Sequence, residues 1–70
     1  MSEQKAKSLG VKPLGYISDF TYTGLDPSRM GLGPAHAIAK ILTKQKKSLK
    51  EIDLFEINEA FAVQVIACQL

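Results

Sequence analysis

The alternation of apolar and polar residues predicts a strand over residues 14–23. One face of the predicted strand collects Leu14, Tyr16, Ser18, Phe20 and Tyr22, and the other collects Ile17, Asp19, Thr21 and Thr23. A period of two with aromatic and β-branched side chains is typical of strands. Because the second face is largely polar, we expect this strand at or near the edge of a sheet.

Helical spacing of apolar residues predicts a helix over residues 34–46. Its apolar stripe consists of Ala35, Ile38, Ile41 and Leu42. Pro34 suits the first turn, where its missing N–H is no loss, and lysines gather on the opposite side and at the C-terminal end, where cations suit the helix dipole. A shorter helix, or the end of one, is expected at residues 2–9, with Gly10 as the stop.

The second half of the chain predicts another strand and another helix. Ser48 and Glu51 have the spacing of a capping box, and the apolar residues that follow predict a short strand over 53–57. Asn58 then caps a helix over 59–70. Two strands joined through a helix form a right-handed parallel βαβ unit, so the fold class is α/β.

The closing helix is apolar on too many sides for a surface helix. From Glu59 to Leu70 only Glu59, Gln64 and Gln69 are polar. A helix that is hydrophobic all round belongs inside a large protein or a membrane, and twelve residues are too few to span a bilayer. We therefore expect burial between two layers that seventy residues cannot supply, in a piece of something larger or with a partner. The alternative is a small, marginally stable domain.

Composition excludes several classes of function. The chain has 46% hydrophobic residues and a formal net charge of +2, which is too slight an excess to predict binding to nucleic acid or to an anionic membrane. A single cysteine rules out an internal disulfide, and no metal-binding framework is present. The N-terminal residues are polar, unlike a secretory signal. We expect a bacterial cytoplasm, with mitochondrion or peroxisome as alternatives.

Two motifs carry a family resemblance. The chain has M-G-x-G-P at Met30–Pro34 and N-E-A-F-A at residues 58–62, roughly two dozen residues later, with G-L-D-P just before the first. In these motifs it resembles the thiolase family, the acetyl-CoA acetyltransferases and 3-ketoacyl-CoA thiolases. The resemblance covers nearly the whole chain. It implies a β-α-β-α slice of a thiolase-like layered α/β/α C-terminal domain (residues 1–70), incomplete on its own.

The resemblance also implies an activity and a reason for its absence here. Thiolases exchange acyl groups between coenzyme A and a 3-ketoacyl-CoA, or condense acetyl-CoA, with coenzyme A thioesters as substrates and no metal or organic cofactor. The family set contains a nucleophilic Cys in the N-terminal half, and a Gly-His-Pro histidine and a second Cys beyond N-E-A-F-A. None of these motifs occurs in this sequence, so the isolated chain is predicted to be inactive.

Site residues follow from the same resemblance. Asn58 would hold a water that forms, with the Gly-His-Pro histidine, one oxyanion hole; the alternative is a plain helix cap worth about 1 kcal/mol. Met30 would border the acyl pocket, and Gly31 and Gly33 would allow close backbone approach, unless they only open a helix. By resemblance the floor near the thioester would be lined by Ala60 and Phe61, which are otherwise core residues.

Other chemically active side chains receive structural interpretations. Glu59 suits the dipole of a first helical turn, and Cys68, without a basic neighbour, is predicted to be an inert core thiol. His36 is not in a Gly-His-Pro context and has ligand contact only as an alternative. The basic run of Lys44, Lys46, Lys47 and Lys50 is a solvated helix end, with coenzyme A phosphates as the alternative contact. A second functional class stays open: a non-catalytic module that forms homo-oligomers through exposed apolar surface.

Overall fold

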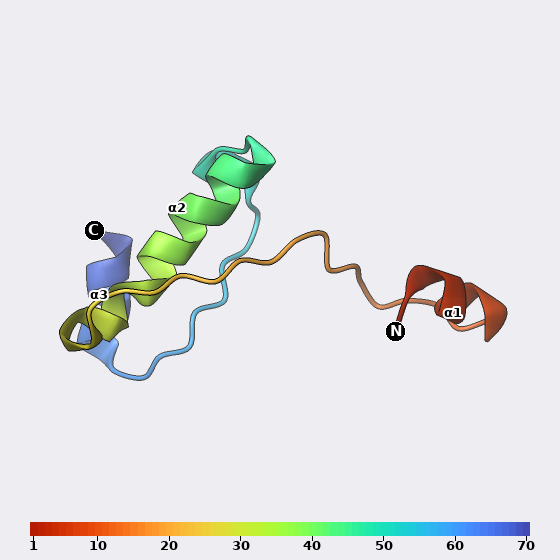
Figure 1. Cartoon of the computed structure of the whole chain (residues 1–70), viewed down its shortest axis with the longest axis horizontal. Helices are drawn as coiled ribbons and strands as arrows, with labels where there is room; N and C mark the ends of the chain where they lie inside the picture. Colours follow the sequence, from red (N-terminus) through yellow and green to blue (C-terminus); the bar gives the residue numbers. More distant parts are fainter.

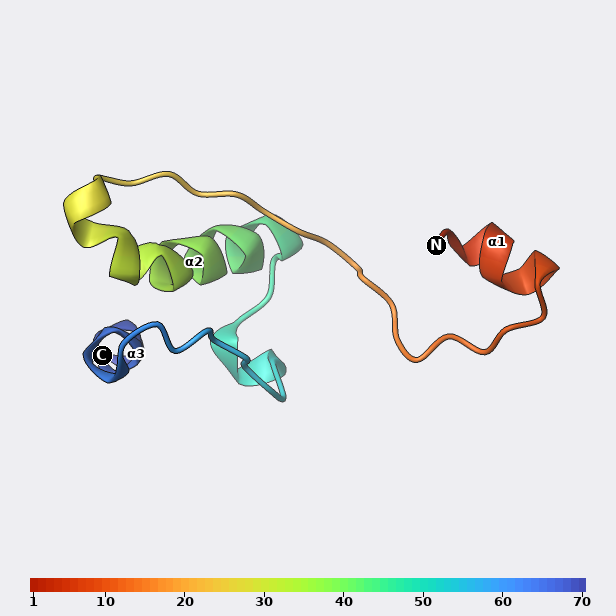
Figure 2. The ribbon, with the colours of Figure 1, turned by 90° about the horizontal axis from the view of Figure 1, so that it is seen from below.

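The computed structural model describes residues 1–70 and contains helices joined by extended chain (Figure 1). The elements, in order, are α1 (Glu3–Ser8), η1 (Pro27–Leu32), α2 (Gly33–Gln45), η2 (Leu49–Glu51) and α3 (Ala62–Gln69), where η1 and η2 are 3₁₀ helices. Helix α1 lies apart at one end of the molecule, and α2 and α3 lie together at the other end (Figures 1 and 2). The elongated shape measures 46 × 25 × 21 Å.

Neither predicted strand forms in this chain. Residues 14–23 and 53–57 run as extended chain without a strand ladder, so the β-α-β-α prediction is corrected here to helices and unpaired segments. The physical reason is that a strand satisfies its backbone N–H and C=O groups only on neighbouring strands. Among the amides of the first segment, Phe20 donates to the Asp19 carboxylate at 2.8 Å.

Helix α2 closely matches the helix predicted over 34–46. A proline occupies its first turn, as expected, and Lys46 ends it in the left-handed conformation at φ 53°. The amides of Lys46 and Lys47 return to the carbonyls of Thr43 and Leu42 at 3.2 and 3.0 Å, which is the hydrogen-bond pattern of a Schellman motif. The predicted capping box is present, and the Ser48 amide donates to Glu51 Oε2 at 2.7 Å.

Helix α1 is short and carries its own caps. The Ser2 hydroxyl accepts from the Lys5 amide at 3.2 Å, and Gly10 follows the helix at φ 65°, a conformation that glycine adopts without steric cost. Ala6 is the one buried residue of the whole chain. Without a larger apolar contact, α1 does not join the body formed by α2 and α3.

The extended segment before η1 is fastened along α2 by polar contacts. Lys44 Nζ lies 2.6 Å from Asp19 Oδ1, and Gln45 donates to the other oxygen of the same carboxylate. Three residues further on, Lys40 Nζ donates to the Tyr22 carbonyl at 2.6 Å. The Lys44 hydrogen bond is the main cause that lowers the pKa of Asp19 below its ordinary value. The polar face of the predicted strand thus contacts α2.

The aromatic face of the same segment points to solvent. Phe20 and Tyr22 meet edge to face with ring centroids 5.9 Å apart, yet they are 67% and 81% exposed. Rings of this size normally provide core or interface area. The segment therefore contributes its polar side to this chain and leaves its apolar side without a neighbour.

The chain buries far less surface than a stable domain of its mass. Its accessible surface is 6498 Å², whereas a compact 7.7 kDa protein exposes about 4,300 Å². Helix α3, predicted to be buried, is exposed: Val63 is 73% and Ile66 57% accessible. Burial of this helix was predicted only within a larger protein or with a partner, because seventy residues cannot supply the covering layers, and it stays a prediction.

Candidate functional site

The turn that contains the first motif is fixed by the residues that precede it. Asp26 Oδ1 accepts from the amide of Ser28 at 2.8 Å and from its hydroxyl at 2.6 Å. The hydroxyl bond, followed by the amide bond, lowers the pKa of the Asp26 carboxyl. Pro27 adds a preset φ in the first turn. The start of η1 is therefore defined locally, before any contact with α3.

Helix α3 approaches η1 closely at Gly31. The Cys68 thiol donates to the Gly31 carbonyl at 3.3 Å. A Cβ atom on Gly31 would lie 2.8 Å from Cγ of Gln64 and 3.4 Å from its Cβ. The shorter separation is below van der Waals contact, so only glycine lets α3 approach this closely.

Gln64 completes the contact between the two elements. Its Nε2 lies 3.9 Å from the sulfur of Cys68, one helical turn further along α3, and its Oε1 is buried without a donor. Gln64 was not among the site residues predicted from the sequence. The available signal was an amide in the middle of an apolar helix, spaced four residues from the only thiol.

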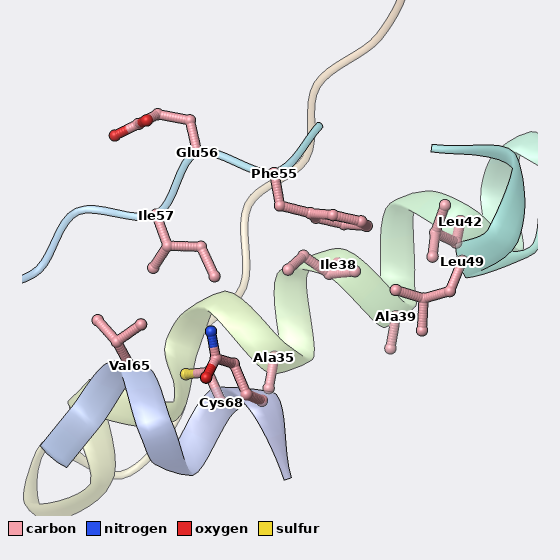
Figure 3. Close-up of a pocket in the computed structure, with 11 residues that line it drawn as sticks. Ala35, Ile38, Ala39, Leu42, Leu49, Phe55, Glu56, Ile57, Val65 and Cys68 are labelled. Atoms are coloured by element: carbon pink, nitrogen blue, oxygen red, sulfur yellow. The ribbon is translucent and has the colours of Figure 1, made fainter. Parts of the chain in front are cut away.

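An apolar cleft of about 560 Å³ opens between α2, α3 and the segment that joins η2 to α3. In Figure 3, Phe55 and Ile57 point into the cleft, whereas Glu56 points away from it. The cleft is lined by Ala35, Ile38, Ala39, Leu42, Leu49, Phe55, Glu56, Ile57, Val65, Cys68 and Gln69. One wall of this cleft consists of Ala35, Ile38 and Leu42 from the apolar stripe predicted for α2, whereas Ile41 of that stripe does not line it.

The second motif lies on exposed chain just before α3. Asn58 does not cap the helix: its carbonyl accepts from the Ala60 amide at 3.1 Å, and the residue at the cap position is Phe61, without a side-chain cap bond. The helix begins only after the tight turn at Asn58, so α3 spans Ala62–Gln69 and not the predicted residues 59–70. Glu59 accordingly precedes the helix and does not occupy its first turn.

Helix α3, which begins at the end of the second motif, contacts the first motif at Gly31, but most of the predicted site residues are exposed. Gly31 and Gly33 are half-buried, and Met30 and Phe61 are each 67% accessible. Asn58 and Ala60 are also exposed.

The remaining candidate side chains lie outside this contact, except Cys68. His36 is exposed on the first turn of α2, and Lys44 is engaged with Asp19. Cys68, predicted as core, is half-buried. No group of three or more His, Cys, Asp or Glu residues is placed to share a metal ion, and the helices lack the combined length and hydropathy of a membrane span.

The sequence matches a family model described as "Thiolase, C-terminal domain" over residues 11–70. This chain belongs to the thiolase family. The resemblance carried by the two motifs is therefore confirmed. The thiolase fold follows from the family, although the strands of such a fold do not form in this chain alone.

Curated relatives of this thiolase chain include bacterial acyltransferases. It is 51% identical over 67 residues to a "Probable acetyl-CoA acyltransferase" of Staphylococcus aureus strain N315, which covers 96% of this chain and 17% of that protein. The same description belongs to a protein of strain MRSA252, at 49% identity over 67 residues. The thiolase chain thus spans about a sixth of the length of these relatives. No solved structure matches the chain significantly.

Proposed function

We propose that this segment forms part of the acyl-CoA site of a full-length thiolase, which transfers acyl groups between coenzyme A and a 3-ketoacyl-CoA or condenses acetyl-CoA. The observation that supports this most is the 51% identity to a probable acetyl-CoA acyltransferase over 96% of the chain. In such an enzyme a cysteine thiolate attacks the carbonyl carbon, and the oxyanions that develop must be stabilised. The coenzyme A thioester is the substrate, and the proposal includes no metal or organic cofactor.

Asn58 carries the proposed catalytic role. A neutral amide donates hydrogen bonds and orients a water without acquiring charge, which suits the oxyanion hole of a thioester enolate. Its exposed position on the chain before α3 leaves the amide available, because it is not used as a helix cap. The histidine and cysteine partners of this chemistry would come from other parts of the full-length enzyme.

The substrate-binding role is assigned to the turn before α2 and to the end of the second motif. Met30 would border the acyl chain, and Gly31 and Gly33 would bring backbone close to it. Near the thioester, the floor would consist of Ala60 and Phe61. The exposure of Met30 and Phe61 supports this assignment, since an apolar side chain that faces solvent in the segment is free to contact a ligand.

The extended segments are proposed to become strands in the full-length enzyme. Residues 14–23 and 53–57 form no strand ladder in this chain, and the aromatic face of the first segment has no cover. In the full-length enzyme, neighbouring strands would pair with these segments, and a second helical layer would cover the aromatic face. Helix α3 would then be buried between layers. A bacterial cytoplasmic enzyme is the corresponding expectation for its location.

A segment exchange tests the proposed function. The 67 residues of the S. aureus N315 acyltransferase that align with this chain are replaced by this sequence; the product is called the exchange enzyme below. Thioester cleavage of acetoacetyl-CoA with free coenzyme A is then followed. We expect activity comparable to that of the unaltered relative, because the two segments are 51% identical over 67 residues and are proposed to supply the same part of the site, and we expect no turnover from the isolated chain.

Two results would contradict the proposal. A folded exchange enzyme that has lost activity would show that this segment does not supply a working acyl-CoA site. Turnover by residues 1–70 alone would contradict the assignment of the nucleophile and the acid-base group to other parts of the enzyme. Circular dichroism and a thermal melt of the exchange enzyme separate loss of fold from loss of function.

A second candidate, a self-associating module, is favoured by the exposed apolar surface of the isolated chain. Leu14, Ile17 and Leu54 are 107%, 90% and 88% accessible, and a large exposed apolar patch marks an interface or an aggregation site. We expect the isolated chain to form concentration-dependent homo-oligomers in sedimentation velocity. Phe20→Lys should weaken association about tenfold, the loss expected when a charge enters an apolar contact, whereas Gln4→Lys adds the same charge on α1 and should change little. A strictly monomeric chain would rule this function out.

A further inference from the structure

The glycine at position 31 is required by a side chain and not by its own backbone. Among the glycines only Gly10 has a positive φ, so the conformation of Gly31 suits any L-residue. The obstacle is Gln64, whose Cγ lies 2.8 Å from the place of a Cβ on Gly31. The two residues therefore specify each other across the contact between η1 and α3.

We infer that Gln64 is a positioning residue that sets the path of the Met30–Gly33 turn and, through Met30, the acyl chains that the site accepts. This inference rests on the proposed function, which places Met30 beside the acyl chain. Gln64 itself is not assigned a contact with substrate. It acts through the turn that it holds.

The Gln64 side chain cannot easily move away from a Cβ on residue 31, because the atom that would clash, Cγ, lies near the Gln64 backbone. Cγ is the second side-chain atom, so moving it requires a new rotamer for the whole side chain. The amide end is half-enclosed against Cys68, with Nε2 at 3.9 Å from the sulfur, and the same thiol donates to the Gly31 carbonyl at 3.3 Å. One face of α3 thus contacts the turn at two points, four residues apart.

This geometry predicts how the turn moves when Gly31 or Gln64 is substituted. A methyl group on Gly31 pushes the turn away from α3, and the neighbouring Met30 moves with it. Removal of the Gln64 side chain beyond Cβ leaves the nearest atom at 3.4 Å, which a small adjustment accommodates. A residue that keeps Cγ but lacks the amide preserves the contact and removes the buried Oε1 that has no donor.

A double-mutant cycle in the exchange enzyme tests the inference. The variants are Gly31→Ala, Gln64→Ala, both together, and Gln64→Met as the matched control. KM and kcat are measured for acetoacetyl-CoA and for a longer 3-ketoacyl-CoA, together with the Tm of each variant. We expect Gly31→Ala to raise KM about tenfold and to change the ratio of kcat/KM between the two substrates, and the double variant to regain most of this loss, as residues in contact do. Gln64→Met should behave like the parent.

The inference is overturned if the effects of the two alanine substitutions add, or if Tm shifts while KM and the substrate ratio stay constant, which is the signature of a purely structural residue. Failure of the proposed function looks different. In that case the folded exchange enzyme is inactive before any substitution, and only the Tm values of the four proteins in the cycle test whether Gly31 and Gln64 are coupled. Non-additive changes in Tm support the coupling, and additive changes refute it.

Discussion

Replacement of Asn58 by alanine in the exchange enzyme is expected to lower kcat for thioester cleavage by about two to three orders of magnitude, the loss that follows removal of one oxyanion-hole donor. KM should change much less, because the oxyanion develops only in the transition state and ground-state binding does not use this donor. The measurement is steady-state kinetics with acetoacetyl-CoA and coenzyme A.

Two further variants make the result specific to the amide. Asn58→Asp is nearly isosteric but exchanges a donor for a negative charge, so it should be at least as damaging as alanine. Glu59→Gln alters the adjacent exposed residue and should leave kcat within about twofold, as surface substitutions do. Equal losses at both positions would point to a disturbed chain before α3, and full activity of Asn58→Ala would remove Asn58 from the mechanism.

The amides of residues 14–23 and 53–57 are expected to exchange with solvent deuterium at least about a thousandfold more slowly in the exchange enzyme than in the isolated chain. In the isolated chain these segments have no strand ladder, so their hydrogens are open to water. In the full-length enzyme the proposed sheet would pair them with neighbouring strands. Mass spectrometry of overlapping peptides resolves the two segments.

Helix α2 provides the internal reference for this experiment. Its amides are hydrogen-bonded already in the isolated chain, so their rates should change less between the two proteins. Rapid exchange of residues 14–23 and 53–57 in both proteins would contradict the proposed strands. Strong protection in the isolated chain would instead indicate that copies of the chain pair their extended segments, in agreement with the self-associating module.

The features that could be predicted from the sequence are those that local chemistry determines. Pro34 and the apolar stripe located α2 to within one residue at each end, and the capping box at Ser48 and Glu51 is formed as expected. The motif residues identified the family before any comparison. In each case the information lies within a few neighbouring positions, where hydrogen bonds and side-chain spacing act directly.

The features that could not be predicted depend on residues that are distant in sequence and close in space. Alternation over 14–23 correctly identifies two different faces, but the polar one contacts α2 through Asp19 and the aromatic one has no cover. Asn58 has the right residue type for a cap, yet its carbonyl bond to Ala60 delays the helix. The role of Gln64 becomes visible only when α3 is seen against Gly31, since their separation in sequence gives no hint of it.

The fastening of Asp19 and Tyr22 to α2 has a consequence for how a full-length enzyme would fold. Strand pairing is vulnerable to slippage by one residue, which turns every side chain to the wrong side. Here the lysines of α2 hold the segment at two points, 2.6 Å from each partner, across a loop of modest length whose closure entropy is small. In the full-length enzyme, where residues 14–23 are proposed to become a strand, these contacts would align the segment with α2 before it pairs with strands from distant parts of the polypeptide.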